Sequence, residues 1–436
     1  TIAPGEAVEI GPFRLHPIRV AHSVLDNLAF AIETPAGVLL AGGDFKIDAG
    51  APPHERTDLE AISRWGDRGI LALLSDSTNA ERPGTTGGED DVVPAFEDVL
   101  SRTRGRVLVS CFATSIPRMQ RVSDAAARAG RPVAFLGRRM VDNAGVAIDL
   151  GLLQVPAGTR LGPDELQGGP GDRALVFVSG SQGEPLSALS LVSLADHRQI
   201  SAGPGDTVVL SARVIPGNER TVSRLIGNLF RLGCDVVHPG LEKVHVSGHG
   251  NREDLVELLR RARPRYLVPV HGEYRMLVQH ARLAASAGFP ADDVLVAEDG
   301  DVVSLSARGA WKEGRVPAGR TLLDRSGVGE VEEVVVRDRR HLSAQGVVVP
   351  IVVVDRQTGR LESVPEIVTR GVAEGEEAAT LNEQAGQFLA ETIEARPAEE
   401  RRDIEATRER VRQALRRFLR KRTQQRPLVV PVVMEV

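Results

Sequence analysis

The chain has 436 residues, of which 42% are apolar and 26% charged, as expected for a globular protein of about two to four domains. Only 3% are aromatic, which argues against a broad stacking platform for nucleic acid, and the net charge of −5 means that a polyanion would have to bind to a local patch or to bound cations. Two isolated cysteines, Cys111 and Cys234, argue against a disulfide scaffold or a thiolate zinc site. With no signal peptide and no apolar run of membrane-spanning length, we predict a cytoplasmic protein without membrane contact.

Residues 1–90 alternate short apolar runs with turns, a pattern that predicts a sheet. The predicted strands lie in "AVEIG", "FRLHPIRV", "LAFAIET", "GVLLAGG" and "GILALLSD", with one helix in "TDLEAISRWGD". The chain begins without Met, directly in the first strand pair. We therefore expect it to be a fragment whose N-terminal part is missing.

From residue 91 the sequence changes to regular strand and helix alternation, which is typical of a parallel sheet covered on both faces. After residue 244 a helix in "REDLVELLRRAR", a strand in "RYLVPVHG" and a helix in "RMLVQHARLAASAG" are predicted to return to the first sheet. The predicted organisation is a core of residues 1–90 and 244–310, interrupted by an inserted domain at 91–243.

Residues 311–330 are predicted to be a linker, and residues 331–436 a small α/β domain. Its predicted strands are "EVEEVVVRD", "GVVVPIVVVD" and "PLVVPVVMEV", with two helices, the second around "RDIEATRERVRQALRRFLRKR". The last two strands are apolar on both faces, so we predict that this domain drives dimerisation or tetramerisation. The second helix has one apolar face and one face rich in arginine. A solvated face is the favoured interpretation, with contact to RNA or to another subunit as alternatives.

Four potential metal ligands lie at or just past the ends of predicted strands, namely His22, Asp44, Asp76 and His271, and a fifth, His249, lies in "SGHG". Histidine nitrogen and carboxylate oxygen are common zinc ligands, and a carboxylate can bridge two cations. Taken alone, each residue is better explained by ordinary hydrogen bonding in a loop. The other histidines, among them His16, His245 and His280, are interpreted as structural or exposed.

The segments "GDFKID", "SDSTNAERPG", "GSQGEP", "PGNE" and "PVHGEYR" together make the chain resemble the ribonuclease J family, in the β-CASP branch of the metallo-β-lactamase superfamily. The resemblance covers nearly the whole chain. It implies an αββα metallo-hydrolase core, partial here, with an inserted β-CASP domain and a small C-terminal α/β domain. It also implies 5′-to-3′ exonuclease and endonuclease activity on RNA in rRNA maturation and mRNA decay, a homodimer or homotetramer, and partners in RNA decay.

The same resemblance implies a role for each site residue. His22, Asp44 and His271 match the ligands of two zinc ions (Mn²⁺ or Mg²⁺ being alternatives), with Asp44 bridging them. Asp76 and His249 match the catalytic pair, and Ser247 with His249 matches the motif that holds the scissile phosphate. The loops around Ser179, Ser181, Gly217 and Asn218 are predicted to bind substrate phosphate through their donors.

The sequence also lacks one motif of this family, a His-x-His-x-Asp-His motif that supplies further ligands. We expect this motif upstream of Thr1 and therefore predict that the chain alone is inactive. Two other functions were considered: a non-catalytic RNA-binding or scaffold subunit, and a small-molecule metallo-hydrolase. The filled ligand positions argue against the first, and the large inserted domain argues against the second.

Overall fold

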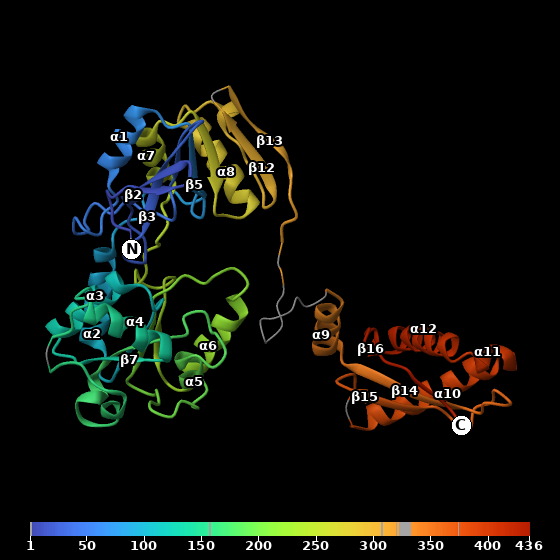
Figure 1. Ribbon diagram of the computed structural model, residues 1–436. Coiled ribbons are helices and arrows are strands. Elements are labelled where there is room, and N and C mark those ends of the chain that lie inside the picture. Colours follow the sequence, from blue (N-terminus) through green and yellow to red (C-terminus); the bar gives the residue numbers. More distant parts are fainter. Residues whose placement is uncertain (1, 157, 307, 320, 322–332, 374) are drawn as a thin grey trace. The chain divides into compact units, whose positions relative to one another are not determined.

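In a computed structural model the chain packs into two units, Thr1–Ala318 and Gly319–Val436 (Figure 1). The structure describes residues 2–156, 158–306, 308–319, 321, 333–373 and 375–436. Both units combine helices with sheets that contain parallel strands, which confirms the predicted α/β class. No helix among the described residues is long and apolar enough to cross a membrane.

The first sheet of the larger unit has six strands in the order β1-β2-β3-β4-β5-β11. Their bounds are Val8–Ile10, Phe13–Arg19, Leu28–Thr34, Gly37–Ala41, Ala72–Asp76 and Tyr266–Val270. Neighbouring strands are antiparallel from β1 to β4, whereas β4, β5 and β11 are parallel. The runs "ALLSD" and "YLVPV" are almost continuously buried, as expected for parallel strands covered on both faces.

Helices α1 (Leu59–Arg68), α7 (Arg252–Ala262) and α8 (Tyr274–Ser286) pack their apolar side chains into one core with this sheet. A second cluster joins β5 and β11 to the hairpin of β12 (Asp301–Ser306) and β13 (Gly309–Arg315). The pairing of β13 with β12 corrects the predicted start of the linker, because residues 311–315 complete this hairpin. Residues 322–330 of the predicted linker lie outside the described residues.

The second sheet of the larger unit is entirely parallel, in the order β10-β9-β6-β8-β7. Its strands are β6 (Val107–Ser110), β7 (Val133–Leu136), β8 (Leu175–Val178), β9 (Thr207–Leu210) and β10 (Asp235–Val237). The 3₁₀ helix η1 (Glu89–Val92) and helix α2 (Val93–Arg102) precede β6. The helices between the strands are α3 (Ile116–Arg128), α4 (Arg138–Asp149), α5 (Ala188–Ser193) and α6 (Glu219–Arg231).

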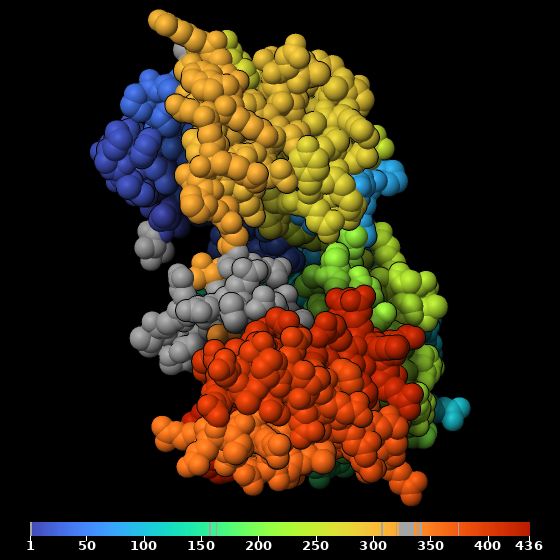
Figure 2. Space-filling view, turned by 90° about the vertical axis from the view of Figure 1, so that its right-hand side faces the viewer, coloured from blue at the N-terminus to red at the C-terminus, as the bar shows by residue number. Residues whose placement is uncertain are grey.

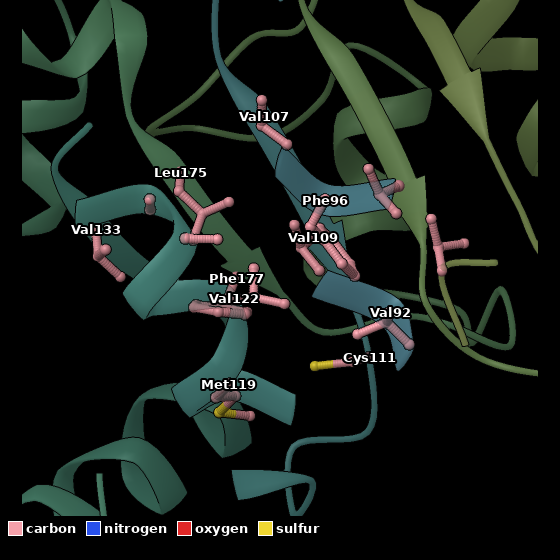
Figure 3. Packing of buried hydrophobic residues seen from close by; sticks show 14 of the residues in the cluster. Val92, Phe96, Val107, Val109, Cys111, Met119, Val122, Val133, Leu175 and Phe177 are labelled. Carbon is pink, nitrogen blue, oxygen red and sulfur yellow. The ribbon is translucent and has the colours of Figure 1, made fainter. Parts of the chain in front are cut away.

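Alternate residues of these strands enter two different apolar cores. Val107 and Val109 pack with Phe96, Met119 and Phe177 in the core seen in Figure 3, whereas Leu108 lies in the opposite core. This follows from the two-residue period of a strand. The boundaries predicted at residues 90 and 243 stay predictions, because packing divides the chain only between Ala318 and Gly319.

The central strand of the smaller unit is β14 (Val347–Val354). On one side it pairs antiparallel with β15 (Glu366–Arg370). On the other side it pairs parallel with β16 (Leu428–Val429) and β17 (Val432–Glu435). Its helices are α9 (Glu333–Gln345), α10 (Gly375–Glu394), α11 (Ala398–Arg402) and α12 (Ile404–Thr423). The strand predicted from "EVEEVVVRD" is wrong, because its described part begins α9. A run of valines has the local signature of a strand, but strand propensity depends on context and does not by itself fix the conformation.

Candidate functional site

The five site residues predicted from the sequence come together at one edge of the first sheet. His22 and Asp44 each lie three residues past the end of β2 and β4, Asp76 ends β5, and His271 directly follows β11. These four strands run in the same direction, so their carboxyl ends share an edge. His249 reaches the same place from the loop that precedes α7.

The Asp44 carboxylate lies between two imidazole rings and presents a different oxygen to each. Its Oδ2 lies 3.8 Å from Nε2 of His22, and its Oδ1 lies 3.4 Å from Nε2 of His271. His22, Asp44 and His249 form one group of potential metal ligands, and Asp76, His249 and His271 form another. A carboxylate with one oxygen directed at each of two nitrogen ligands fits a divalent cation on either side.

His22 is held in the tautomer that a metal requires. Its Nδ1 lies 2.8 Å from the carbonyl oxygen of Gly248, and since a carbonyl only accepts, Nδ1 carries the proton and Nε2 presents a lone pair toward Asp44. Burial lowers the pKa of His22 more than this hydrogen bond raises it, which favours the neutral ring. A Cβ at Gly248 would lie 2.6 Å from Nδ1 and Cε1 of His22, so only glycine permits this close approach.

His249 and Asp76 form a hydrogen-bonded pair, with 2.7 Å between Nδ1 and Oδ2. The other oxygen of Asp76 accepts from the backbone and hydroxyl of Thr78, and the Asp76 side chain is only 1% exposed. Burial raises the pKa of Asp76, but the hydrogen bond and charge of His249 bring it below its ordinary value. Burial likewise lowers the pKa of His249, but Asp76 and then Asp44 raise it above its ordinary value. Both Asp76 oxygens are engaged by protein donors, so this residue orients His249.

Two residues that were not singled out in the sequence fix the backbone of the His249 loop. Asn79 donates through Nδ2 to the hydroxyl of Ser247 (2.9 Å) and to the carbonyl of His249 (2.8 Å). Thr86 donates its hydroxyl to the same carbonyl at 2.9 Å. Both lie at or just beyond "SDSTNAERPG", and a short polar run after a buried strand was the available signal.

Two arginines add positive charge beside this loop. Arg213 donates to Oδ1 of Asn79 at 3.2 Å, and burial followed by the charge of Arg213 lowers the pKa of Arg82. The charge of Arg213 also acts on His249. Cations held close together in this way favour an anion between them.

The residues predicted in the phosphate-binding loops lie past strands of the second sheet, and their hydrogen bonds run to neighbours in those loops. The hydroxyl of Ser179 accepts from the backbone of Ala188, and Ser181 is buried. The backbone of Gly217 donates to Glu219. Asn218 donates to Gln182, which also accepts from the backbone of Ile215. No hydrogen bond within the described ranges joins these four residues to the histidines.

A buried ionic cluster connects the loop of Asp44 to the loop of His249. Glu89 accepts from Lys46 at 3.0 Å and from Arg118 at 2.6 Å, and all three side chains are at most 4% exposed. Arg118 also donates to the hydroxyl of Ser211 (2.8 Å) and the carbonyl of Val246 (3.1 Å). Lys46 lies two residues after Asp44, and Val246 directly precedes Ser247. The cluster therefore ties both site-bearing loops to the second sheet.

Known proteins resemble the chain along nearly its whole length. Residues 104–229 match the family described as "Ribonuclease J, beta-CASP domain", residues 236–294 match "Zn-dependent metallo-hydrolase RNA specificity domain" and residues 334–436 match "Ribonuclease J C-terminal domain". Ribonuclease J 1 of Streptococcus pyogenes is 35% identical over 95% of this chain and 74% of that protein. Ribonuclease J of Mycobacterium tuberculosis is 38% identical over 100% of this chain and 77% of that protein. Ribonuclease J of Corynebacterium glutamicum is 36% identical over 97% of this chain and 59% of that protein.

Proposed function

Because this chain belongs to the ribonuclease J family, we propose that the edge formed by His22, Asp44, Asp76, His249 and His271 is its part of a site that hydrolyses RNA phosphodiester bonds once the family's His-x-His-x-Asp-His motif is also present. The family prediction made from the sequence is thereby confirmed. The observation that carries the proposed site is the Asp44 carboxylate, whose two oxygens face two different imidazole nitrogens. We propose a 5′-to-3′ exonuclease with endonuclease activity.

Metal binding follows from the family, and we propose that Asp44, with His22 and His271 on either side of its carboxylate, supplies the protein ligands of two zinc ions. Two of these three ligands are imidazoles, which suit Zn²⁺, whereas Mn²⁺ and Mg²⁺ prefer oxygen ligands such as the Asp44 carboxylate. The chemistry supplied by bound cations is Lewis-acid activation of the phosphodiester and of water. The side chains themselves fix the positions of the nitrogen and oxygen donors, and Gly248 orients His22 through its carbonyl oxygen.

His249 is proposed to contact the scissile phosphate. Asp76 holds the proton on Nδ1, which leaves Nε2 to donate to a phosphate oxygen when the ring is cationic. The raised pKa of His249 favours this cationic form. Ser247, held by Asn79, would donate beside it. Asp76 acts through His249 and is a positioning residue.

Arg82 and Arg213 are proposed as further phosphate contacts, because they bring two positive charges next to Asn79. The loops of Ser179, Ser181, Gly217 and Asn218 remain our prediction for a more distant phosphate of the same RNA. A 5′-monophosphorylated RNA should then be degraded faster than a triphosphorylated one. Equal degradation rates for the monophosphorylated and the triphosphorylated RNA would contradict that assignment.

The smaller unit is proposed to form the subunit contact of a homodimer or homotetramer. Along β14 buried residues alternate with half-exposed ones, so one face of an entirely apolar strand remains uncovered. Val430, Val432 and Met434, in and beside the edge strand β17, are 38–45% exposed. Exposed apolar strands of this kind are typical of interfaces.

The metal content and RNA cleavage of single-site variants test the assignment. Three ligands cannot complete two shells of three or four protein donors, so we expect the 436-residue chain alone to bind at most one divalent ion, weakly, and to be inactive. In a protein that also carries the family's His-x-His-x-Asp-His motif, Asp44→Ala should remove both metal and hydrolysis. His249→Ala should retain metal but slow cleavage about 10²–10³-fold.

His54→Ala is the matched control, because the His54 side chain is 71% exposed, and it should change neither quantity. Full metal content in Asp44→Ala would show that the ligand assignment is wrong. A labelled lactam or thioester assayed beside the RNA separates this function from that of a small-molecule hydrolase. A protein that carries the His-x-His-x-Asp-His motif and binds RNA without cleaving it would be a scaffold subunit.

A further inference from the structure

The helical side of the smaller unit contains a groove between α10 and α12 that the proposed function does not use. It has a volume of about 690 Å³, and its walls include Phe388 and Gln387 from α10 and Arg417, Phe418 and Lys421 from α12. Helix α12, coloured red, forms part of the exposed surface of this unit in Figure 2. The groove lies on the opposite side of β14 from the uncovered apolar face, because the buried residues of β14 pack against these same helices.

Two aromatic rings line the groove in a chain that has few aromatic residues. The rings of Phe388 and Phe418 are stacked, with 5.0 Å between centroids and 25° between planes. Both residues are only partly buried, at the edge of the apolar core. A half-exposed aromatic pair offers a flat apolar surface on which a nucleobase can stack.

Unpaired cations surround these rings. Residues 416–426, "RRFLRKRTQQR", contain six Arg or Lys and no acidic residue, although the whole chain carries a net charge of −5. Earlier in α12, Arg408, Arg410 and Arg412 pair with glutamates. Among the described residues, Arg417, Lys421 and Arg422 have no ion-pair partner. Of the described residues that line the groove, Glu391 alone carries a carboxylate.

A second, more enclosed cavity of about 280 Å³ shares Arg417 with the groove. Arg396, Arg401 and Arg410 also line it, and none of its described lining residues is acidic. The Nε of Arg401 is buried and has no hydrogen-bond partner in the described part of the chain. Buried donors are ordinarily satisfied, so this cluster of guanidinium groups matches an anion with several acceptor oxygens.

We propose that the α10–α12 groove binds single-stranded RNA, with a base stacked on Phe388 and Phe418 and backbone phosphates on Arg417, Lys421 and Arg422. The proposal rests on RNA being the substrate, but it does not depend on the metal ligands. Charge complementarity selects a polyanion. A second copy of the chain fits less well, because an isologous contact would place these cations against each other.

RNA binding by the full chain in EDTA tests the proposal without cleavage. Fluorescence anisotropy of a labelled single-stranded oligoribonucleotide is followed as a function of salt concentration. The triple variant R417Q/K421Q/R422Q should bind about tenfold more weakly, with a log–log salt slope shallower by about 2, because each lost phosphate contact removes about 0.7. R408Q/R412Q/R416Q removes the same charge from another face of α12 and should retain the parent slope.

Equal affinities and slopes for the two triple variants would overturn the proposal. The proposal would also be overturned if the groove variant lost its oligomeric state in light scattering and bound RNA more weakly for that reason, because the groove would then be a subunit contact. Photo-crosslinking of 4-thiouridine RNA to the unmodified chain gives a reading that does not depend on the folding of any variant. Crosslinks at Phe388 or Phe418 support the groove, and their absence contradicts it. Binding is measured in EDTA, so a loss confined to R417Q/K421Q/R422Q does not depend on metal, which separates this test from that of the metal site.

Discussion

Replacing Glu89 by glutamine should destabilise the larger unit strongly, because it leaves two buried cations without their shared anion. Lys46 and Arg118 both contact the Glu89 carboxylate and are each 2% exposed. Glutamine keeps the size and one acceptor oxygen of the side chain, but its NH2 group replaces the other oxygen and faces a cationic donor, so the substitution removes the charge and one of the two hydrogen bonds.

The magnitude follows from the pKa of Glu89. Burial raises that pKa, but the charges of Arg118 and then Lys46, with their hydrogen bonds, lower it from 4.5 to about 2. At about 1.4 kcal/mol per pKa unit, the ionised carboxylate contributes about 3 kcal/mol to the free energy of unfolding. This agrees with the roughly 3–5 kcal/mol lost when one partner of a buried ion pair is removed.

Urea unfolding at neutral pH measures this loss, and Glu97→Gln is the matched control. Glu97 pairs with Arg128 on the surface, where both side chains are about half exposed, so its removal should cost less than about 1 kcal/mol. The folded pKa of Glu89 is depressed, so its stabilisation is complete above pH 4.5 and is lost as the pH falls toward 2. A loss at neutral pH no larger than that of Glu97→Gln would refute the reasoning.

Three further changes have defined outcomes. Burial lowers the pKa of His280 from 6.5 to about 4, so the free energy of unfolding should decrease as the pH falls below 6.5. In urea titrations, His280→Gln should show a decrease that is smaller by about 2 kcal/mol at about pH 5. Gly248→Ala should weaken metal binding in calorimetry, because its Cβ would meet His22, whereas Gly145→Ala, whose Cβ meets nothing within 4 Å, should not. A chain that ends after Ala318 should be monomeric in light scattering, and an unchanged number of subunits per particle would exclude the smaller unit as the interface.

The positions of the metal-site residues could be predicted because they depend on strand ends alone. His22, Asp44, Asp76 and His271 each lie at or shortly after an apolar run, and strands that run in one direction bring their ends to one edge. The sequence order of the residues is then irrelevant. The α10–α12 groove could not be predicted in this way. The sequence shows the basic face of α12, but Phe388, which stacks on Phe418, comes from another helix.

Contacts between distant segments could not be predicted in this way. Lys46, Glu89 and Arg118 are charged residues that composition alone assigns to the surface, and only the packing of two sheets makes their burial favourable. Asn79 looks like a turn residue, yet it anchors a loop 168 residues further along the chain. The helix α9 was missed because a run of valines has the local signature of a strand.

The loop of Ser247, Gly248 and His249 joins the metal side of the site to the phosphate side. The carbonyl of Gly248 orients His22, and the two flanking residues carry the hydroxyl and the imidazole that we propose as contacts to the substrate. Arg118 holds the carbonyl of Val246 immediately before this loop, and Asn79 holds it at Ser247 and His249. In our assignment, a shift of the loop therefore moves a proposed metal ligand and a proposed phosphate contact together. For this reason, substitutions at Arg118 or Asn79, which touch neither metal nor RNA in our assignment, should reduce metal affinity and cleavage in parallel, whereas His249→Ala separates the two.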